Sequence, residues 1–159
     1  MKKVLVMGLV ILMLVVTGCG KEENKNDTTE EYQTMSCYRN ATTGNVRMEI
    51  NAKVKHDGEY VKTVKTVEKI ISDDESVLEY YEDMLTNMYA PYLELKYYDN
   101  EVAIEGNTLI SRTEVDYSKV DTNKMIELDS SNALLIKDGK IKIEDIKELY
   151  ETNTGLICE

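Results

Sequence analysis

The residues with the most distinctive chemistry in this chain are its three cysteines, Cys19, Cys37 and Cys158. Cysteine thiols pair as disulfides in exported proteins, bind metals where other cysteines or histidines stand close by, and act as nucleophiles beside a base. No CxxC spacing occurs, and no histidine adjoins Cys37 or Cys158. We therefore expect these two thiols to form a disulfide, with free thiols or an intermolecular bond as the alternatives. Closing a loop of roughly 120 residues in this way would stabilise the fold by about 4–5 kcal/mol.

Cys19 ends a segment that has the parts of a secretory signal. A basic start at Lys2 and Lys3 precedes an uncharged apolar run over residues 4–16, and small residues stand directly before the cysteine. The run is typical of a signal peptide and is shorter than the roughly 17–25 residues of a membrane-spanning helix. The segment resembles the bacterial lipobox, so we expect residues 1–18 to be a lipoprotein signal peptide and Cys19 to carry lipid. A retained signal anchor is the alternative.

The predicted lipid anchor determines where the rest of the chain lies. Each buried methylene of an acyl chain contributes about 0.8 kcal/mol, and two or three chains make the attachment stable. We therefore expect a lipid-anchored protein on the extracytoplasmic face of a bacterial cell membrane. Residues 19–34 would be the lipidated cysteine and a flexible tether, because this stretch is too polar to bury a core. The remainder, 35–159, is long enough for a single folded domain.

The chain is strongly acidic, with 19 Lys and Arg against 30 Asp and Glu and a formal net charge of −11 at pH 7. Binding to nucleic acid requires clustered cations that displace counterions from the phosphates. Nucleic acid is therefore not an expected partner. The plain interpretation of the charge is solubility, and binding of cations or basic partners is the alternative.

The sequence offers little for catalysis. The lone histidine, His56, adjoins the Asp57-Gly58 turn, where we expect it to bind water. The glycines stand singly rather than in a cluster that holds phosphate. With so many acids, carboxyl groups come together by chance, so a glycosidase-like pair is only a weak alternative. We therefore expect no catalytic residues, no metal site and no cofactor.

Tyrosine is the only aromatic residue type apart from that single histidine, with 11 tyrosines and no Phe or Trp. Two adjacent pairs, 80–81 and 97–98, would turn one ring of each pair toward a core and leave the other for solvent. Tyr80 and Tyr97 with Tyr89 and Tyr92 form a candidate binding patch for a protein or small-molecule ligand. Packing of these rings at the core edge is the alternative. Exposed rings within about 10 Å of one another would favour the patch.

Two hairpins are expected to build the sheet. Residues 46–55 alternate apolar and polar side chains, the pattern of a half-buried strand, and residues 60–71 return after a type I′ turn at Asp57-Gly58. Apolar residues recur every third position in the returning strand, which indicates a bulge. A second turn at residues 106–107 pairs Ile104 with Leu109 and Glu101 with Arg112.

Three helical segments are predicted around these hairpins. Ser72 and Glu75 form a capping-box pattern before a stripe of Val77, Tyr81, Met84 and Met88, with Leu78 and Leu85 beside it, and this helix ends before Pro91. A short helix over 121–128 is capped by Asp121, with Met125, Ile126 and Leu128 turned inward. Asp138-Gly139 indicates a small third hairpin, and a last helix carrying Ile146, Leu149 and Tyr150 ends at Gly155.

The expected fold class is α+β: a small antiparallel sheet built from hairpins, with two or three helices packed on one face of a single domain. The lipobox cysteine and tether, the hairpin segment 54–61 and the segment 115–121 resemble the YehR-like lipoproteins. The resemblance implies the same arrangement of sheet and helices over about 36–159. It implies no catalytic residues, because none are established for that family.

These observations leave three functional classes. The expected function is a non-catalytic binding module at the cell envelope, which captures an unknown protein or small molecule. The alternative is an accessory or structural subunit of an envelope complex, and a hydrolase is the third.

Overall fold

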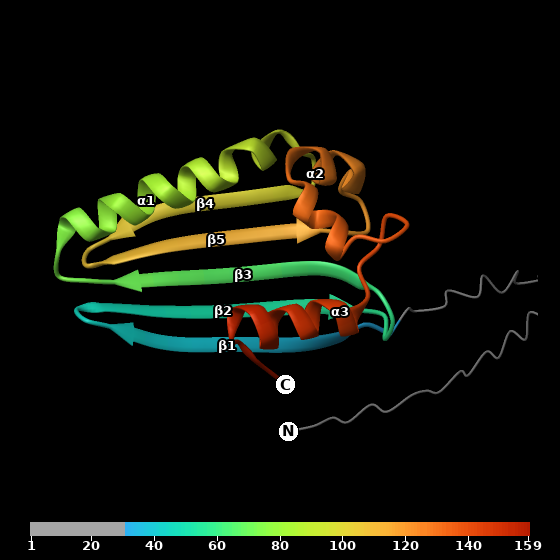
Figure 1. Cartoon of the computed structure of the whole chain (residues 1–159), viewed down its shortest axis with the longest axis horizontal. Coiled ribbons are helices and arrows are strands. Elements are labelled where there is room, and N and C mark those ends of the chain that lie inside the picture. Colours follow the sequence, from blue (N-terminus) through green and yellow to red (C-terminus); the bar gives the residue numbers. More distant parts are fainter. Residues whose placement is uncertain (1–30) are drawn as a thin grey trace, which may run out of the picture.

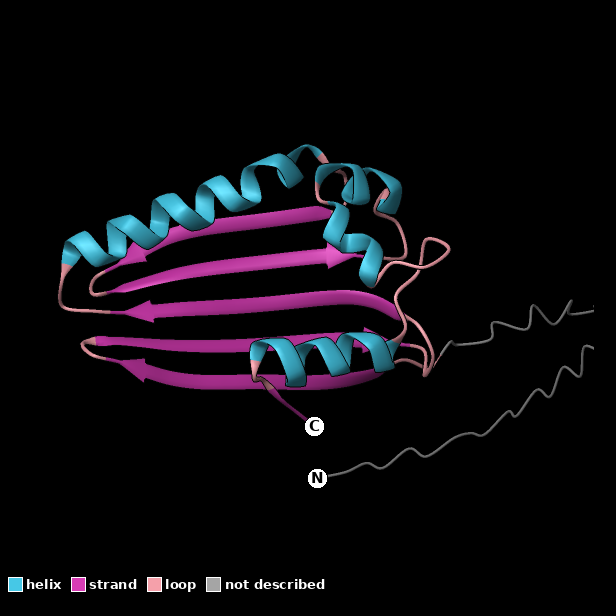
Figure 2. Cartoon of the chain, viewed as in Figure 1, coloured by secondary structure: helices cyan, strands magenta, loops and turns pink. Residues whose placement is uncertain are grey.

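The computed structural model describes residues 31–159, which form a six-stranded antiparallel sheet with three α-helices along one of its faces (Figures 1 and 2). The predicted signal peptide and Cys19 lie outside the described residues. The first strand begins at Gln33, two residues before the predicted start of the domain. The sheet order is β4-β5-β3-β2-β1-β6, with β1 Gln33–Thr43, β2 Val46–His56, β3 Val61–Ile71, β4 Tyr98–Glu105, β5 Thr108–Asp116 and β6 Ile157–Cys158.

The β2–β3 hairpin is confirmed, and its predicted bulge lies between Lys55 and His56, at the end of β2. The predicted two-residue type I′ turn is wrong, because the turn spans four residues and only Gly58 among them has a positive φ. The Asp57 carboxylate accepts hydrogen bonds from the backbone N–H groups of Glu59 and Tyr60, and these bonds stabilise the longer turn. His56 is buried rather than hydrated, and its Nδ1 accepts a hydrogen bond from the Gly58 N–H at 3.1 Å.

The β4–β5 hairpin has the predicted register. Ile104 lies opposite Leu109, and Glu101 lies opposite Arg112. The turn works because Gly106 adopts a positive φ of 65°, which suits a glycine in a tight two-residue turn. The pairing of β5 with β3 then brings the two hairpins into one sheet.

Helix α1, Glu75–Tyr89, follows β3 and lies over β4 and β5 (Figure 1). Its N-cap is Asp74 rather than the predicted Ser72, which is buried and accepts a hydrogen bond from the Asp74 N–H. The buried face is centred on Leu78 and Leu85. Of the predicted inward stripe, Met84 and Met88 are 41% and 49% exposed. The side of α1 that contacts the core is therefore centred on Leu78 and Leu85, which were predicted beside the stripe, rather than on the stripe itself.

The C-terminal third of the chain adds two short helices. Helix α2, Thr122–Leu128, has the predicted Asp121 cap, and Met125 is buried, but Leu128 is exposed. Asp138 and Gly139 both have positive φ and close a small turn. Helix α3, Ile143–Glu148, continues as π-helical turns over Leu149–Thr154 and ends at Gly155, as predicted. No helix within residues 31–159 combines the length and the apolar character needed to cross a membrane.

The helices cover one face of the sheet, as predicted, and the other face is left without helices (Figures 1 and 2). Charged side chains such as Lys53, Lys65 and Glu114 are exposed on that uncovered face. Lys65 and Glu114 pair across β3 and β5 at 2.8 Å.

A disulfide joins Cys37 of β1 to Cys158 of β6. The two backbone hydrogen bonds between Ser36 and Glu159 extend this contact. The last residues of the chain are thus fixed to β1, and the helix that precedes them is held over β1 and β2.

We expect loss of this disulfide to lower the free energy of unfolding by about 3–5 kcal/mol, because the unfolded chain regains the freedom of a loop of roughly 120 residues. The test compares urea unfolding of residues 31–159 as the parent, Cys37→Ser, Cys158→Ser and the double variant. Since either single substitution breaks the same bond, all three variants should lose nearly the same stability. A double variant as stable as the parent would contradict this prediction.

Candidate functional site

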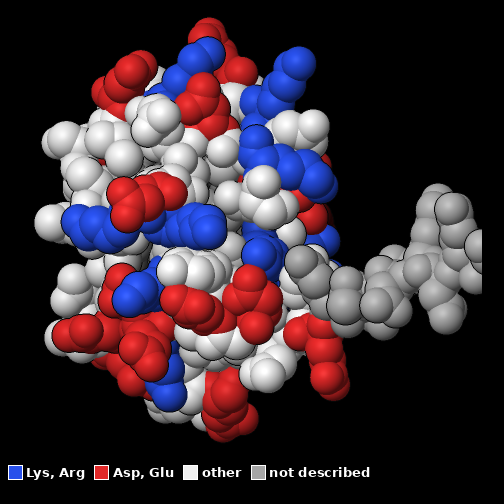
Figure 3. Space-filling view, turned by 90° about the vertical axis from the view of Figure 1, so that its right-hand side faces the viewer, with Lys and Arg blue, Asp and Glu red and all other residues white. Residues whose placement is uncertain are grey.

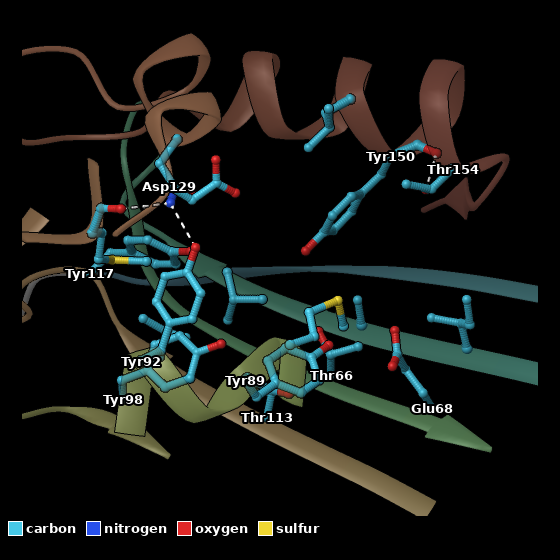
Figure 4. A pocket seen from close by; sticks show the side chains of 18 of the residues that line it. Thr66, Glu68, Tyr89, Tyr92, Tyr98, Thr113, Tyr117, Asp129, Tyr150 and Thr154 are labelled. Carbon is cyan, nitrogen blue, oxygen red and sulfur yellow. Dashed lines mark hydrogen bonds between the residues drawn. The ribbon is translucent and has the colours of Figure 1, made fainter. Parts of the chain in front are cut away.

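A cavity of about 520 Å³ lies above the middle of the sheet, between the end of α1 and the turns that follow α3 (Figure 4). Strands β2, β3 and β5 form its floor. The volume falls within the roughly 300–1,000 Å³ of small-molecule sites. We call it the tyrosine cavity, because its lining includes Tyr89, Tyr92, Tyr98, Tyr117 and Tyr150.

The floor of the tyrosine cavity combines polar side chains, Thr66, Glu68 and Thr113, with apolar ones that include Ile50, Val64 and Val115. The strand register sets the residues of the helix-covered face in rows that cross the sheet. Two neighbouring central rows contain a threonine pair and the only carboxylate of the floor. The first row is Ala52, Thr66 and Thr113, and the second is Ile50, Glu68 and Ser111.

Larger apolar side chains form the rows on either side of these central rows. The row Met48, Ile70 and Leu109 belongs to the core under α1, where Ile70 and Leu109 pack with Leu78 and Leu85. The row Val54, Val64 and Val115 belongs to a separate core, which includes Met125 of α2 and Ile146 of α3. Each group of helices packs on its own apolar row, so the space over the central rows stays open.

Tyrosines from opposite walls reach the polar floor. Tyr89, at the end of α1, and Tyr150, after α3, both line the cavity; Thr113 and Glu68 are among the groups that shift the pKa of Tyr89, and Thr66 is among those that shift the pKa of Tyr150. Figure 4 shows Tyr150 projecting from its helix toward the sheet, opposite Tyr89 and Tyr92. Two phenol groups are thus aimed at one polar surface.

A stacked aromatic pair forms another wall. The rings of Tyr92 and Tyr98 lie 5.1 Å apart with an angle of 19° between their planes. The side-chain amide of Asn132 donates a hydrogen bond to the Tyr92 hydroxyl at 3.2 Å. Asn132 belongs to a 3₁₀ turn, Ser130–Leu134, so this bond fixes the turn against the wall.

Burial keeps the tyrosine hydroxyls of the cavity neutral. Burial, with the nearby Glu68 charge as a second cause, raises the pKa of Tyr89 to about 12. Burial also raises the pKa of Tyr98, Tyr117 and Tyr150 above the ordinary value. At physiological pH these groups therefore act as hydrogen-bond donors and acceptors without charge.

The position of Tyr150 depends on the π-helical turns that follow α3. The backbone carbonyl of Tyr150 accepts a hydrogen bond from the Thr154 hydroxyl at 2.6 Å. Arg39 of β1 donates to the Thr154 carbonyl at 2.6 Å, which ties the end of these turns to the sheet. π-helical turns are rare in proteins, and those that occur are often found at functional sites. Here the irregularity lies at the residues that line the cavity.

The carboxyl group of Glu68 is the main charged group in the floor of the cavity. Burial raises the pKa of this carboxyl group, and hydrogen bonding from Tyr89 partly offsets the increase. Glu68 forms no ion pair within the described part of the chain. No lysine, arginine or histidine is among the described residues that line the cavity. The second carboxylate of the lining, Asp129, caps the 3₁₀ turn by accepting the Ser131 N–H at 2.8 Å.

The structure divides the four predicted patch residues into two groups. Tyr89 and Tyr92 are half-buried and line the cavity together. Tyr80 and Tyr97 are 65% and 50% exposed and do not belong to the lining. Tyr80 contacts the ring of the adjacent Tyr81 at 5.5 Å. The cavity therefore takes up half of the predicted patch.

Four residues that line the cavity were not predicted from the sequence: Thr66, Glu68, Tyr117 and Tyr150. A signal for the first two was present in β3, where the inward positions 64, 66, 68 and 70 read Val, Thr, Glu and Ile. Polar residues at two inward positions of a central strand indicate a cavity or a buried polar site. The signal can be used only once the bulge has fixed which positions point inward.

Another hollow, of about 440 Å³, lies over the uncovered face of the sheet and is lined mainly by charged and polar side chains such as Lys65, Glu101 and Arg112. In residues 31–159 no group of three or more His, Cys, Asp or Glu side chains is arranged to hold a metal ion. The end of the molecule shown in Figure 3 carries acidic and basic side chains intermingled. That end therefore lacks the uniformly basic surface that phosphate backbones attract.

Two solved structures are similar to this one in fold. The NMR structure of the E. coli YehR protein aligns with a TM-score of 0.51 and 17% sequence identity, over 77% of this chain and 88% of that one. The NMR structure of a protein from Streptococcus pneumoniae TIGR4 aligns with a TM-score of 0.50 and 13% identity, over 99% and 98% of the two chains. The expected YehR-like fold is therefore present. No family model and no curated protein sequence matches the chain.

Glu68→Gln should change how stability depends on pH. A raised carboxyl pKa means that the folded chain holds its proton more tightly than the unfolded chain, so the contribution of Glu68 is fully present below its unfolded pKa and is lost as pH rises through the folded pKa. The variant has no such loss. Urea unfolding from about pH 4 to about pH 8 should show the variant gaining stability over the parent as pH rises.

The matched control is Glu101→Gln, which removes the same charge from an exposed position on β4. Its stability should run parallel to that of the parent across this pH range. If Glu68→Gln also runs parallel to the parent, Glu68 is not destabilised by burial.

Proposed function

We propose that this protein is a lipid-anchored binding module of the bacterial cell envelope that holds a small molecule in the tyrosine cavity without catalysing a reaction on it. The observation that carries this proposal is the polar central rows of the sheet, with Thr66 and Glu68 on β3 and Thr113 on β5 beneath an open cavity.

A folding requirement alone does not account for these residues. An unfilled space in a core costs stability, and larger apolar side chains at Thr66 and Thr113 would reduce that cost. A carboxylate in the same floor adds a desolvation penalty, as the raised pKa of Glu68 indicates. Polar groups that converge on one space and lower stability are typical of a ligand site.

The membrane anchor is proposed from the sequence and from the resemblance to the YehR-like lipoproteins. Cys19 follows a basic and apolar segment with small residues directly before it. Residues 20–32 separate that cysteine from β1 and span at most about 45 Å when fully extended. Such a tether would leave the cavity clear of the lipid headgroups.

The two carboxyl groups of the cavity lining are the observation that speaks most against a protein without catalytic activity. Glu68 has a raised pKa, whereas hydrogen bonds from Ser131 lower the pKa of Asp129. Hydrolases use two carboxyl groups with such opposite shifts. The carboxylate of Asp129, however, is engaged as a helix cap, and this supports a structural role for it.

Filling the cavity should remove the bound molecule. Full-length lipoprotein is captured from membranes, and its small molecules and proteins are identified by mass spectrometry. The parent should release a stoichiometric small molecule, and Thr66→Phe should lose at least about nine-tenths of it, because the new ring occupies the cavity floor. Thr63→Phe is the matched control, since Thr63 is also half-buried on β3 but points to the uncovered face.

Three outcomes would count against the proposal. Equal recovery from parent and Thr66→Phe would remove the cavity from the function. A stoichiometric protein in place of any small molecule would favour the accessory-subunit alternative. If the parent converts the recovered molecule during incubation and Glu68→Gln does not, the protein is an enzyme.

The lipid anchor has its own test. In cells fed an alkyne-tagged fatty acid, the parent should be labelled and should sediment with membranes, and Cys19→Ser should lose the label and at least about nine-tenths of the membrane-bound fraction. The double variant Cys37→Ser, Cys158→Ser should be labelled like the parent. A label that survives Cys19→Ser would contradict attachment at this cysteine.

A further inference from the structure

We propose that the ligand of the tyrosine cavity is an organic cation, an amine or a quaternary ammonium compound, whose charged group is held by the Glu68 carboxylate and the surrounding tyrosine rings. This inference rests on the proposed function and assigns the chemical class of its ligand.

The charge of the lining selects a cation. Glu68 lies on the floor without an ion-pair partner, and the described lining residues include no basic side chain. An anionic ligand would meet like charge from Glu68 and Asp129. A cation instead supplies the missing opposite charge and offsets the cost of burying an ionised carboxylate.

The tyrosine rings provide a second source of attraction for a cation. The electron-rich faces of aromatic rings attract ammonium groups within about 6 Å, and more strongly where water is excluded. Two tyrosines outside the cavity already bind lysines of this chain in this way, with the Nζ atoms of Lys55 and Lys140 lying 4.1 and 4.8 Å from the ring centres of Tyr32 and Tyr60. Within the cavity no lysine of the described lining takes that place.

The shape of the cavity suggests where the rest of the ligand lies. A second cavity of about 180 Å³ lies beneath α1, where Tyr81 and Met84 of α1 and Met48 of β2 line it, and it shares Ile50, Glu68 and Met88 with the first. Its lining also includes Lys69, which follows Glu68 on β3 at a position that alternation places on the uncovered face of the sheet. Glu68 therefore lies where the two spaces meet. A charged group at Glu68 can extend an apolar chain along α1, in contact with methionine side chains that adapt to different shapes.

The test uses three probes with the same six-carbon chain and different charge: hexyltrimethylammonium, hexanol and hexanoate. Titration calorimetry is done on the full chain in nonionic detergent at about pH 8. The cation should bind the parent roughly tenfold or more tightly than hexanol, and hexanoate should bind more weakly than either. Glu68→Gln should bring the cation close to hexanol, and Glu101→Gln should leave the order unchanged.

Dependence on pH gives an independent readout. A cation prefers ionised Glu68, so its affinity should fall by up to about tenfold per pH unit below the pKa of the empty site, and hexanol affinity should stay constant. Equal binding of all three probes, or a cation preference that survives Glu68→Gln, would overturn the inference.

The capture experiment separates this inference from the proposed function. A neutral or anionic molecule that is recovered from the parent and lost from Thr66→Phe would sustain the proposed function and overturn the cationic class. A recovered amine that Glu68→Gln no longer retains would support both.

Discussion

The structure depends on the cross-strand register of four central strands, because the register decides which side chains share a row beneath the helices. The bulge at Lys55/His56 shifts β3 against β2, so that Val54 lies opposite Val64 and Ala52 opposite Thr66. A one-residue slip would turn Thr66 and Glu68 to the uncovered face and bring Lys65 and Val67 inward. The long β2–β3 turn, held by Asp57, is therefore as important for the cavity as the residues that line it.

The two apolar rows of the sheet explain why the helices lie apart. Helix α1 is bound to the row of Ile70 and Leu109, and the C-terminal helices are bound to the row of Val54 and Val64. The disulfide and β6 hold the end of the chain at β1, so the turns that carry Tyr150 remain on their own side of the cavity. Because each helix group is fixed independently, no continuous core fills the cavity above Thr66, Glu68 and Thr113.

Sequence reasoning predicted the features that are encoded locally. Alternation and a Gly106 turn determined the β4–β5 register, and the Asp121 cap determined the start of α2. It placed the α1 cap at Ser72 because the capping-box spacing is satisfied there, whereas the burial of Ser72 moves the cap to Asp74. The cavity was not predictable in this way. Its floor joins Thr66 to Thr113 through the β3–β5 pairing, and that pairing connects segments separated by a whole helix and a strand.

The charge of the whole molecule and that of the cavity have the same sign, and this has a consequence for binding. A formal net charge of −11 attracts cations to the surface, although salt limits the range of that attraction to roughly 8 Å at physiological ionic strength. Inside the cavity screening is weaker, so Glu68 acts on a bound cation more strongly than an exposed acid does. The surface charge would therefore raise the rate at which a cationic ligand arrives. The affinity would be set by the half-buried Glu68 carboxylate and the tyrosine rings around it.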